Sequence, residues 1–210
     1  MSIVPPSGLP YKLACLCDLR DERGRVLLLR RAKPPNLGLC SPIGGKLDMD
    51  SGESPAQCAR REIREEAGID VALDRLHLLG LISERSYEDS GHWLLFYYLV
   101  MGAVSVPAGP IEEGRLEWHE PAQVASLPLP DTDREIIWPL VERHAPIGGR
   151  PGFFAVHIEC AQGNLSWTED QSIIRPSPQK PVTLTTGAIW LVESHWPEER
   201  WKTVSSLGMS

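Results

Sequence analysis

The chain has 210 residues, of which 42% are hydrophobic and 23% are charged, and this balance excludes a disordered or fibrous protein. Its formal net charge is −7, which argues against a protein that binds duplex DNA or an anionic membrane through a broad basic face. A nucleotide remains possible as the substrate, because a metal ion neutralises phosphates locally. We therefore expect a globular protein whose partners include neither a nucleic-acid polymer nor a membrane.

The cysteines favour a reducing compartment. The chain has five of them, an odd number, with no CxxC pair, and we expect reduced thiols in or near the core. The first residues lack the layout of a signal peptide, and no apolar run approaches the roughly 18 residues of a membrane span. These features predict a cytoplasmic protein, and we expect a monomer or a homodimer.

The first elements are two strands joined by a turn. Leu13, Cys15 and Cys17 alternate along residues 11–19, which is the period of a half-buried strand with these side chains on one face. A turn signal at 21–24 leads to a returning strand at 25–31. A loop at 34–38 follows, and then a glycine-rich stretch at 42–45.

The clearest helix spans residues 55–67. Ser54 suits the N-cap, Pro55 suits the first helical position, and Gly68 is a stop signal. Three apolar residues recur at helical spacing and should face the core: Ala59, Ile63 and Ala67.

The rest of the first 145 residues predicts further strands and two helices. Strands are expected at 76–86, 92–101 and 116–119, followed by a short helix at 121–127. A last helix should be capped by Asp131 or Thr132 and should end near His144. Strands on both sides of a central helix, followed by a terminal helix, predict a mixed α/β sandwich rather than a doubly wound sheet.

The composition changes after residue 145. Residues 146–152 have the glycine and proline content of a linker, and two segments at 153–160 and 165–174 could pair as a hairpin. No structure is predicted for 175–210. We therefore expect a domain at 1–145 and a C-terminal extension at 146–210.

Three carboxylates are placed together by the predicted helix. Glu62, Glu65 and Glu66 are separated by three and four positions, so they share one helical face. One interpretation is a solvated face whose charges are offset by neighbouring arginines. The other is a site for a hard cation, because Mg²⁺ and Mn²⁺ prefer carboxylate oxygens.

The surrounding sequence resembles the signature of the Nudix hydrolases. That signature is a glycine, five residues, a glutamate, seven residues, then Arg-Glu-aliphatic-x-Glu-Glu-x-Gly-aliphatic. Here Glu53 is followed after seven residues by the run REIREEAGI over 61–69. The departure is between Gly45 and Glu53, where seven residues stand instead of five, so that Met49 and Asp50 form an apparent insertion in the loop.

The resemblance implies an α/β/α sandwich with a central mixed sheet, and hydrolysis of a nucleoside diphosphate linked to another group. It implies that Mg²⁺, with Mn²⁺ as the alternative, is held by Glu62, Glu65, Glu66 and the carbonyl of Gly45. Arg61 should pair with Glu53, and Glu53 should help to position water. Glu65 is expected among the catalytic residues.

A further carboxylate from a distant loop takes part in many family members. Glu112 and Glu113 are the candidates here, and Glu88 is a weaker one. An ordinary exposed loop position is the alternative interpretation for each of these acids.

The segment at 130–140 resembles the last helix of family members that hydrolyse oxidised purine nucleoside triphosphates. By that resemblance Asn36 and either Asp131 or Asp133 would contact the base, although helix capping also explains the two aspartates. An 8-oxo-dGTP-like substrate is therefore expected. ADP-ribose, a nucleotide sugar or a dinucleotide remains the alternative, as does a non-catalytic module that senses nucleotides.

Overall fold

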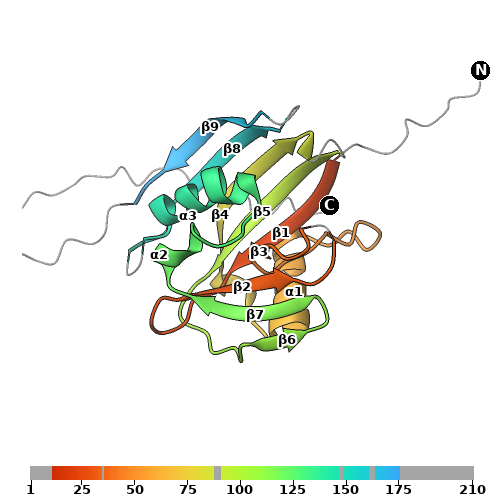
Figure 1. Cartoon of the computed structure of the whole chain (residues 1–210), viewed down its shortest axis with the longest axis vertical. Coiled ribbons are helices and arrows are strands. Elements are labelled where there is room, and N and C mark those ends of the chain that lie inside the picture. The colour runs from red at the N-terminus through yellow and green to blue at the C-terminus, as the bar shows by residue number, and fades with distance from the viewer. Residues whose placement is uncertain (1–10, 35, 88–90, 147–148, 161–163, 176–210) are drawn as a thin grey trace, which may run out of the picture. The chain divides into compact units, whose positions relative to one another are not determined.

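The computed structural model describes residues 11–34, 36–87, 91–146, 149–160 and 164–175, which form two sheets and the helices that pack on them (Figure 1). The larger sheet has the order β1-β5-β4-β8-β9. Its strands are β1 (Tyr11–Asp18), β5 (His92–Val100), β4 (Leu76–Arg85), β8 (Phe153–Glu159) and β9 (Ser166–Ile173). The smaller sheet has the order β3-β2-β7-β6. Its strands are β3 (Cys40–Ser41), β2 (Val26–Arg31), β7 (Gly114–His119) and β6 (Gly109–Ile111).

The larger sheet is mixed, as predicted. β1 pairs parallel with β5, and β4 pairs parallel with β8, whereas the β4–β5 and β8–β9 pairs are antiparallel. The smaller sheet is antiparallel throughout. Its strands β3 and β6 were not predicted, because two or three residues are too few to show a periodic pattern.

Alternation along β1 separates two layers of core. Cys15 and Cys17 belong to a cluster that includes the buried face of α1 (Pro55–Ala67), which confirms that they share one face. Ala14 belongs to a second cluster that includes α3 (Trp138–His144). Helices therefore pack on both faces of the larger sheet, and the predicted fold class is confirmed.

The signals at the ends of α1 act as predicted. The backbone N–H of Gln57 donates to the Ser54 hydroxyl over 3.3 Å, and the Gln57 side chain accepts from the Ser54 N–H over 2.9 Å. Gly68 ends the helix with φ of 70°, a conformation that glycine adopts without strain. The predicted core residues Ala59, Ile63 and Ala67 are buried.

The last helix begins differently from the prediction. A π-helical segment, η3 (Asp133–Ile137), precedes α3, and a short helix α2 (Pro121–Val124) lies before it in sequence. Thr132 makes no capping hydrogen bond, because its own backbone is already helical. The carboxylate of Asp131 instead accepts from Arg134. The capping role predicted for these two residues is therefore wrong.

The C-terminal hairpin joins the larger sheet. β8 and β9 pair antiparallel where the hairpin was predicted, and β8 also pairs with β4. A single 3₁₀ turn, η1 (Leu73–Arg75), leads into β4. The segment at 175–210, for which no structure is predicted, lies outside the described residues apart from Arg175.

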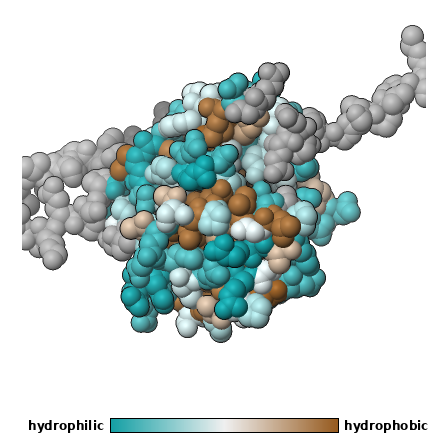
Figure 2. Space-filling model, viewed as in Figure 1, coloured by the Kyte–Doolittle hydropathy of each residue, from teal (hydrophilic) through white to brown (hydrophobic). Residues whose placement is uncertain are grey.

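The hydrophilic surface and the free cysteines match what the amino-acid composition predicts. Figure 2 shows hydrophilic side chains over most of the visible face, with a hydrophobic band across its middle. All five cysteines are free, and four of them are buried. Within the described segments, every helix is too short or too polar to cross a membrane.

Candidate active site

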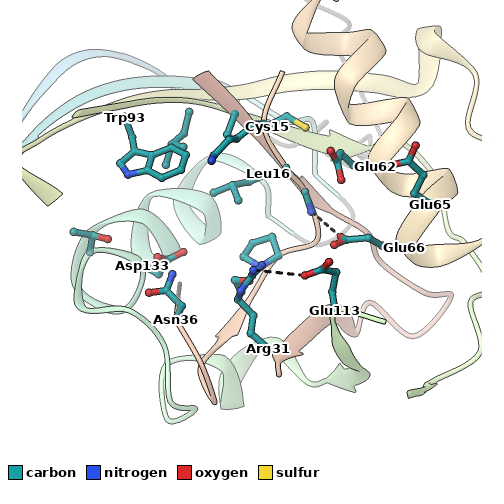
Figure 3. A pocket seen from close by; sticks show the side chains of 18 of the residues that line it. Cys15, Leu16, Arg31, Asn36, Glu62, Glu65, Glu66, Trp93, Glu113 and Asp133 are labelled. Atoms are coloured by element: carbon teal, nitrogen blue, oxygen red, sulfur yellow. Dashed lines mark hydrogen bonds and ion pairs between the residues drawn. The ribbon is translucent and has the colours of Figure 1, made fainter. Parts of the chain in front are cut away.

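The three α1 carboxylates border a pocket (Figure 3). They differ in exposure, because Glu62 is 12% exposed whereas Glu65, one turn further along, is 52% exposed. Burial raises the pKa of Glu62, an effect that Arg61 opposes. The helix therefore presents two half-buried carboxylates, Glu62 and Glu66, and one exposed carboxylate to the same space.

Arg61 lies at the centre of this face. Its Nε and Nη2 each donate to Glu53 over 2.9 Å, which is the pairing expected from the sequence. Its Nη1 donates to Glu62 over 2.5 Å and to Glu65 over 3.2 Å. Arg61 therefore ties the loop before α1 to the carboxylates on the helix, and its hydrogen bonds hold the pKa of Glu53 below the ordinary value.

The two extra loop residues form part of a turn. The Asp48 carboxylate accepts from the backbone N–H groups of Asp50 and Ser51, over 3.2 and 3.3 Å. The N–H of Glu53 then donates to the Asp48 carbonyl over 3.1 Å. The insertion is absorbed before Glu53, so the ion pair between Glu53 and Arg61 is kept.

The two glycines before this loop bring backbone against the carboxylates. The Gly44 N–H donates to Glu66 over 2.9 Å, and a side chain at Gly44 would collide with the Cys15 carbonyl. A side chain at Gly45 would collide with the Glu62 carboxylate. Burial raises the pKa of Glu66 to about 7, although the Gly44 N–H opposes this rise.

The side chains and backbone groups at the α1 end of the pocket are of the kind that binds a hard cation. Carboxylate oxygens and a backbone carbonyl are the ligands that Mg²⁺ prefers. The Gly45 carbonyl accepts from the Cys15 N–H over 2.9 Å and from the Cys58 thiol over 3.6 Å, so a bound ion would take the place of the weak thiol donor. The described His, Cys, Asp and Glu side chains nevertheless form no ready-made group of three. Arg61 engages Glu62 and Glu65, so these two carboxylates would have to turn from the guanidinium to a bound ion.

The pocket extends away from α1 across the larger sheet. Its volume is about 840 Å³, within the range of small-molecule sites. Leu16 of β1 and Trp93 and Leu95 of β5 contribute apolar lining, and Lys46 and Arg31 contribute positive charge. Figure 3 shows the α1 carboxylates on one side of this space and Asn36 and Asp133 on the other.

The far end of the pocket contains a carboxylate that sequence reasoning missed. Glu84 of β4 lines the pocket and is only 4% exposed, and burial raises its pKa to about 7, with the nearby Thr132 hydroxyl opposing the rise. Burial and the charge of Glu84 together raise the pKa of Asp133 to about 7 as well. The signal in the sequence was a charged residue in phase with the buried Ile82, where an apolar side chain would be usual.

Asn36 also lines this end. Its backbone is left-handed, with φ of 63°, and its side-chain oxygen accepts from the Tyr87 hydroxyl over 3.1 Å. Both residues line the pocket, so the loop between β2 and β3 meets the segment after β4 at its rim.

The remaining acidic residues predicted for the site differ in their positions relative to the pocket. Glu112 and Glu113 line the pocket at the α1 end, but the Glu112 side chain is 89% exposed and pairs with Lys33 over 3.0 Å. Glu113 is 38% exposed and pairs with Arg31 over 3.8 Å. Asp131 does not line the pocket. Glu88 lies outside the described residues.

Comparisons with known proteins agree with this arrangement. The model of the NUDIX domain matches residues 10–142. "Uncharacterized Nudix hydrolase YvcI" of Bacillus subtilis is 31% identical over 122 residues, which are 58% of this chain and 73% of that protein. A second Bacillus subtilis protein, named "Putative 8-oxo-dGTP diphosphatase", is 30% identical over 126 residues, which are 60% and 78% of the two chains.

A solved structure shows the same fold. The crystal structure of the mutator MutT protein from Bacillus halodurans superposes with a TM-score of 0.59 and 26% identity, covering 76% of this chain and 97% of that one. Residues 10–142, which match the family, contain both the carboxylate helix and the residues that line the pocket. The chain belongs to the NUDIX family and is a pyrophosphohydrolase.

Proposed function

We propose that the protein hydrolyses nucleoside triphosphates to the monophosphate and pyrophosphate, with an oxidised guanine nucleotide such as 8-oxo-dGTP as the preferred type. The observation that carries this proposal is the pocket itself. One end borders Glu62, Glu65 and Glu66, and the other contains the buried Glu84 and the half-buried Asp133. A nucleotide is divided in the same way. Its phosphates need metal ions, and its base offers hydrogen-bonding groups at the opposite end.

The α1 end would hold Mg²⁺, or Mn²⁺ in its place, through Glu62, Glu65, Glu66 and the Gly45 carbonyl. Such an ion neutralises phosphate charge and makes water more acidic. Arg61 and Glu53 fix the loop against the helix, so that Gly45 stays beside the carboxylates. Water attacks one phosphorus, and the bond to the bridging oxygen breaks.

The middle of the pocket would accommodate the phosphates and the sugar. Lys46 and Arg31 line it and supply positive charge close to the carboxylates. The Trp93 ring has the Lys12 and Lys46 ammonium groups within 5.0 and 6.0 Å of its centroid. This places an aromatic wall and cations together, which suits an anionic ligand that also carries a flat ring.

The relative named for 8-oxo-dGTP supports the substrate type, since it is 30% identical over 126 residues. An ADP-ribose-like substrate would need cations for a second phosphate or ribose, and two exposed arginines do not supply them in the pocket. Arg85 pairs with Glu159 and Arg115 with Glu117, and neither arginine lines the pocket.

A nucleotide panel tests the proposal. The purified full-length chain should be assayed with Mg²⁺ on dNTPs, NTPs, 8-oxo-dGTP, ADP-ribose and a dinucleoside polyphosphate, with product identification in ¹⁸O-labelled water. We expect pyrophosphate release, with label in a single product and the highest kcat/KM for 8-oxo-dGTP.

The matched pair of variants is Glu65→Gln and Glu120→Gln. Glu65 lies at the carboxylate face, whereas Glu120 lies before α2 and pairs with the exposed Arg23. We expect a large loss of turnover only in the first. Nucleotide binding without turnover in the wild type would indicate a sensing module. Turnover of ADP-ribose alone would show that ADP-ribose, and not a nucleoside triphosphate, is the substrate.

A further inference from the structure

At the far end of the pocket, the described residues place two carboxylates that have no ion pair and one buried hydroxyl. Glu84 and Asp133 form no ion pair within the described residues, in contrast with Glu53 and Glu62, which share Arg61. The Thr132 hydroxyl is 4% exposed and lies beside Glu84, yet it has no hydrogen-bond partner of good geometry there. Buried polar groups normally have partners, so the Thr132 hydroxyl and the Glu84 carboxylate without a cation require an explanation. Asp133 lies beside them and is half-buried.

Packing does not provide that explanation. A buried carboxylate without a cation is costly, and an apolar residue would suit an inward position of β4 next to Ile82 better. The three groups line one end of the 840 Å³ pocket rather than a closed core. Unsatisfied polar groups with shifted pKa values in a pocket favour contact with a ligand.

The kind of ligand follows from the groups. Ionised carboxylates only accept hydrogen bonds, and the Thr132 hydroxyl completes a largely accepting surface. A guanine-type base carries N1–H and a 2-amino group side by side, which are two adjacent donors. Adenine has one amino group beside a bare ring nitrogen, and that lone pair would face a carboxylate oxygen.

We propose that Glu84 is a specificity-determining residue, which together with Asp133 selects a base edge with two adjacent N–H donors, as in guanine and 8-oxoguanine, over adenine. The proposal rests on the proposed function, because it assumes that phosphates occupy the α1 end. It adds a residue from β4 to the site and gives the pocket a preferred hydrogen-bonding pattern.

The test compares dGTP with dATP, which carry the same sugar and phosphates. The kcat/KM of each should be measured at pH 8 for the wild type, Glu84→Gln and the exposed control Glu120→Gln. Glutamine keeps the shape but replaces one acceptor with a donor. We expect Glu84→Gln to lower kcat/KM for dGTP by about 10- to 100-fold and to leave dATP within about threefold. The control should keep the wild-type ratio.

Equal losses for both nucleotides would overturn the proposal, because a structural defect acts on both alike. An unchanged ratio would overturn it as well. Binding of dGMP and dAMP, followed by tryptophan fluorescence without divalent metal, separates the two hypotheses. If the wild type hydrolyses no nucleotide but binds dGMP preferentially in a Glu84-dependent way, the proposed reaction fails and the base selection stands. If neither monophosphate is preferred, the base selection fails.

Discussion

The two ends of the pocket use the same type of side chain in opposite ways. At the α1 end, Arg61 donates to three carboxylates within one short segment of loop and helix. At the far end, Glu84 and Asp133 lie close enough for their charges to interact, with no cation from the described part of the chain. The first end is held together by an arginine of the chain, whereas at the second we propose that a ligand supplies the missing donors. Four predictions test this contrast, from the largest expected effect to the smallest.

Glu66→Gln should give the largest effect. Glu66 is bound to the Gly44 N–H, so the amide keeps the shape but loses the negative charge. We expect kcat/KM to fall by about 100- to 1000-fold for every nucleotide, because charge at the reacting end serves all substrates. Steady-state kinetics with Mg²⁺ measures this, with Glu120→Gln as the control. A loss confined to guanine nucleotides would assign Glu66 to the base instead.

Arg61→Ala should destabilise the protein because it leaves Glu53 and Glu62 without their shared cation. The Glu53 side chain is only 10% exposed, and removing one partner of a mostly buried pair costs about 2–4 kcal/mol of unfolding free energy. Chemical denaturation measures this.

The adjacent Arg60→Ala is the matched control for that variant. Arg60 pairs with Asp70 in a largely exposed bridge, which contributes at most about 1 kcal/mol. If the two variants lose equal stability, Arg61 does not organise the α1 end.

The pH dependence of the unfolding free energy should reveal the raised pKa values of the carboxylates at the far end of the pocket. The pKa of Glu84 is raised from 4.5 to about 7, so the folded state binds more protons than the unfolded state between those values. Stability therefore falls as the pH rises from about 4.5 through 7, and Asp133 and Glu66 add to this in metal-free protein. Glu84→Gln should remove part of this loss and should be more stable than the wild type at pH 8, by on the order of 2 kcal/mol.

Urea unfolding at pH 5, 6.5 and 8 without divalent metal measures this slope, with Glu120→Gln as the exposed control. The wild type and Glu84→Gln should differ least at pH 5. Parallel curves for the two proteins would show that Glu84 is not held neutral by burial.

Ser54→Ala should have the smallest effect. It removes the hydroxyl that caps α1 and leaves every carboxylate in place, at a cost of about 1 kcal/mol. For a chain of this size that lowers Tm by about 2–4 °C, measurable by calorimetry. Ser105→Ala, at an exposed loop position before β6, is the control. A Tm equal to that of the control would show that the capping box adds no stability.

Local features were predictable from the sequence because their causes are local. The Ser54 cap, the Gly68 stop and the alternation of Cys15 and Cys17 depend on neighbouring residues, and all three were confirmed. The pairing of Arg61 with Glu53 followed from the resemblance, and the structure adds the turn that absorbs the two extra loop residues.

The far end of the pocket was less predictable because it is assembled over long distances. Glu84 comes from β4, Asp133 from η3 and Asn36 from the loop after β2, and the strand order that joins these elements is not sequential. Asp131 and Asp133 could not be distinguished by spacing, because the prediction assumed a capped α-helix. The chain is instead π-helical from Asp133, which changes the number of residues per turn. Of the two aspartates, only Asp133 lines the pocket.

The most direct test is a crystal structure of Glu66→Gln with dGTP and Mg²⁺, in which slow turnover preserves the ligand. The account predicts phosphates at the α1 carboxylates and the guanine edge within hydrogen-bond distance of Glu84 and Asp133. A base that lies outside the far end of the pocket, or phosphates bound there, would contradict it.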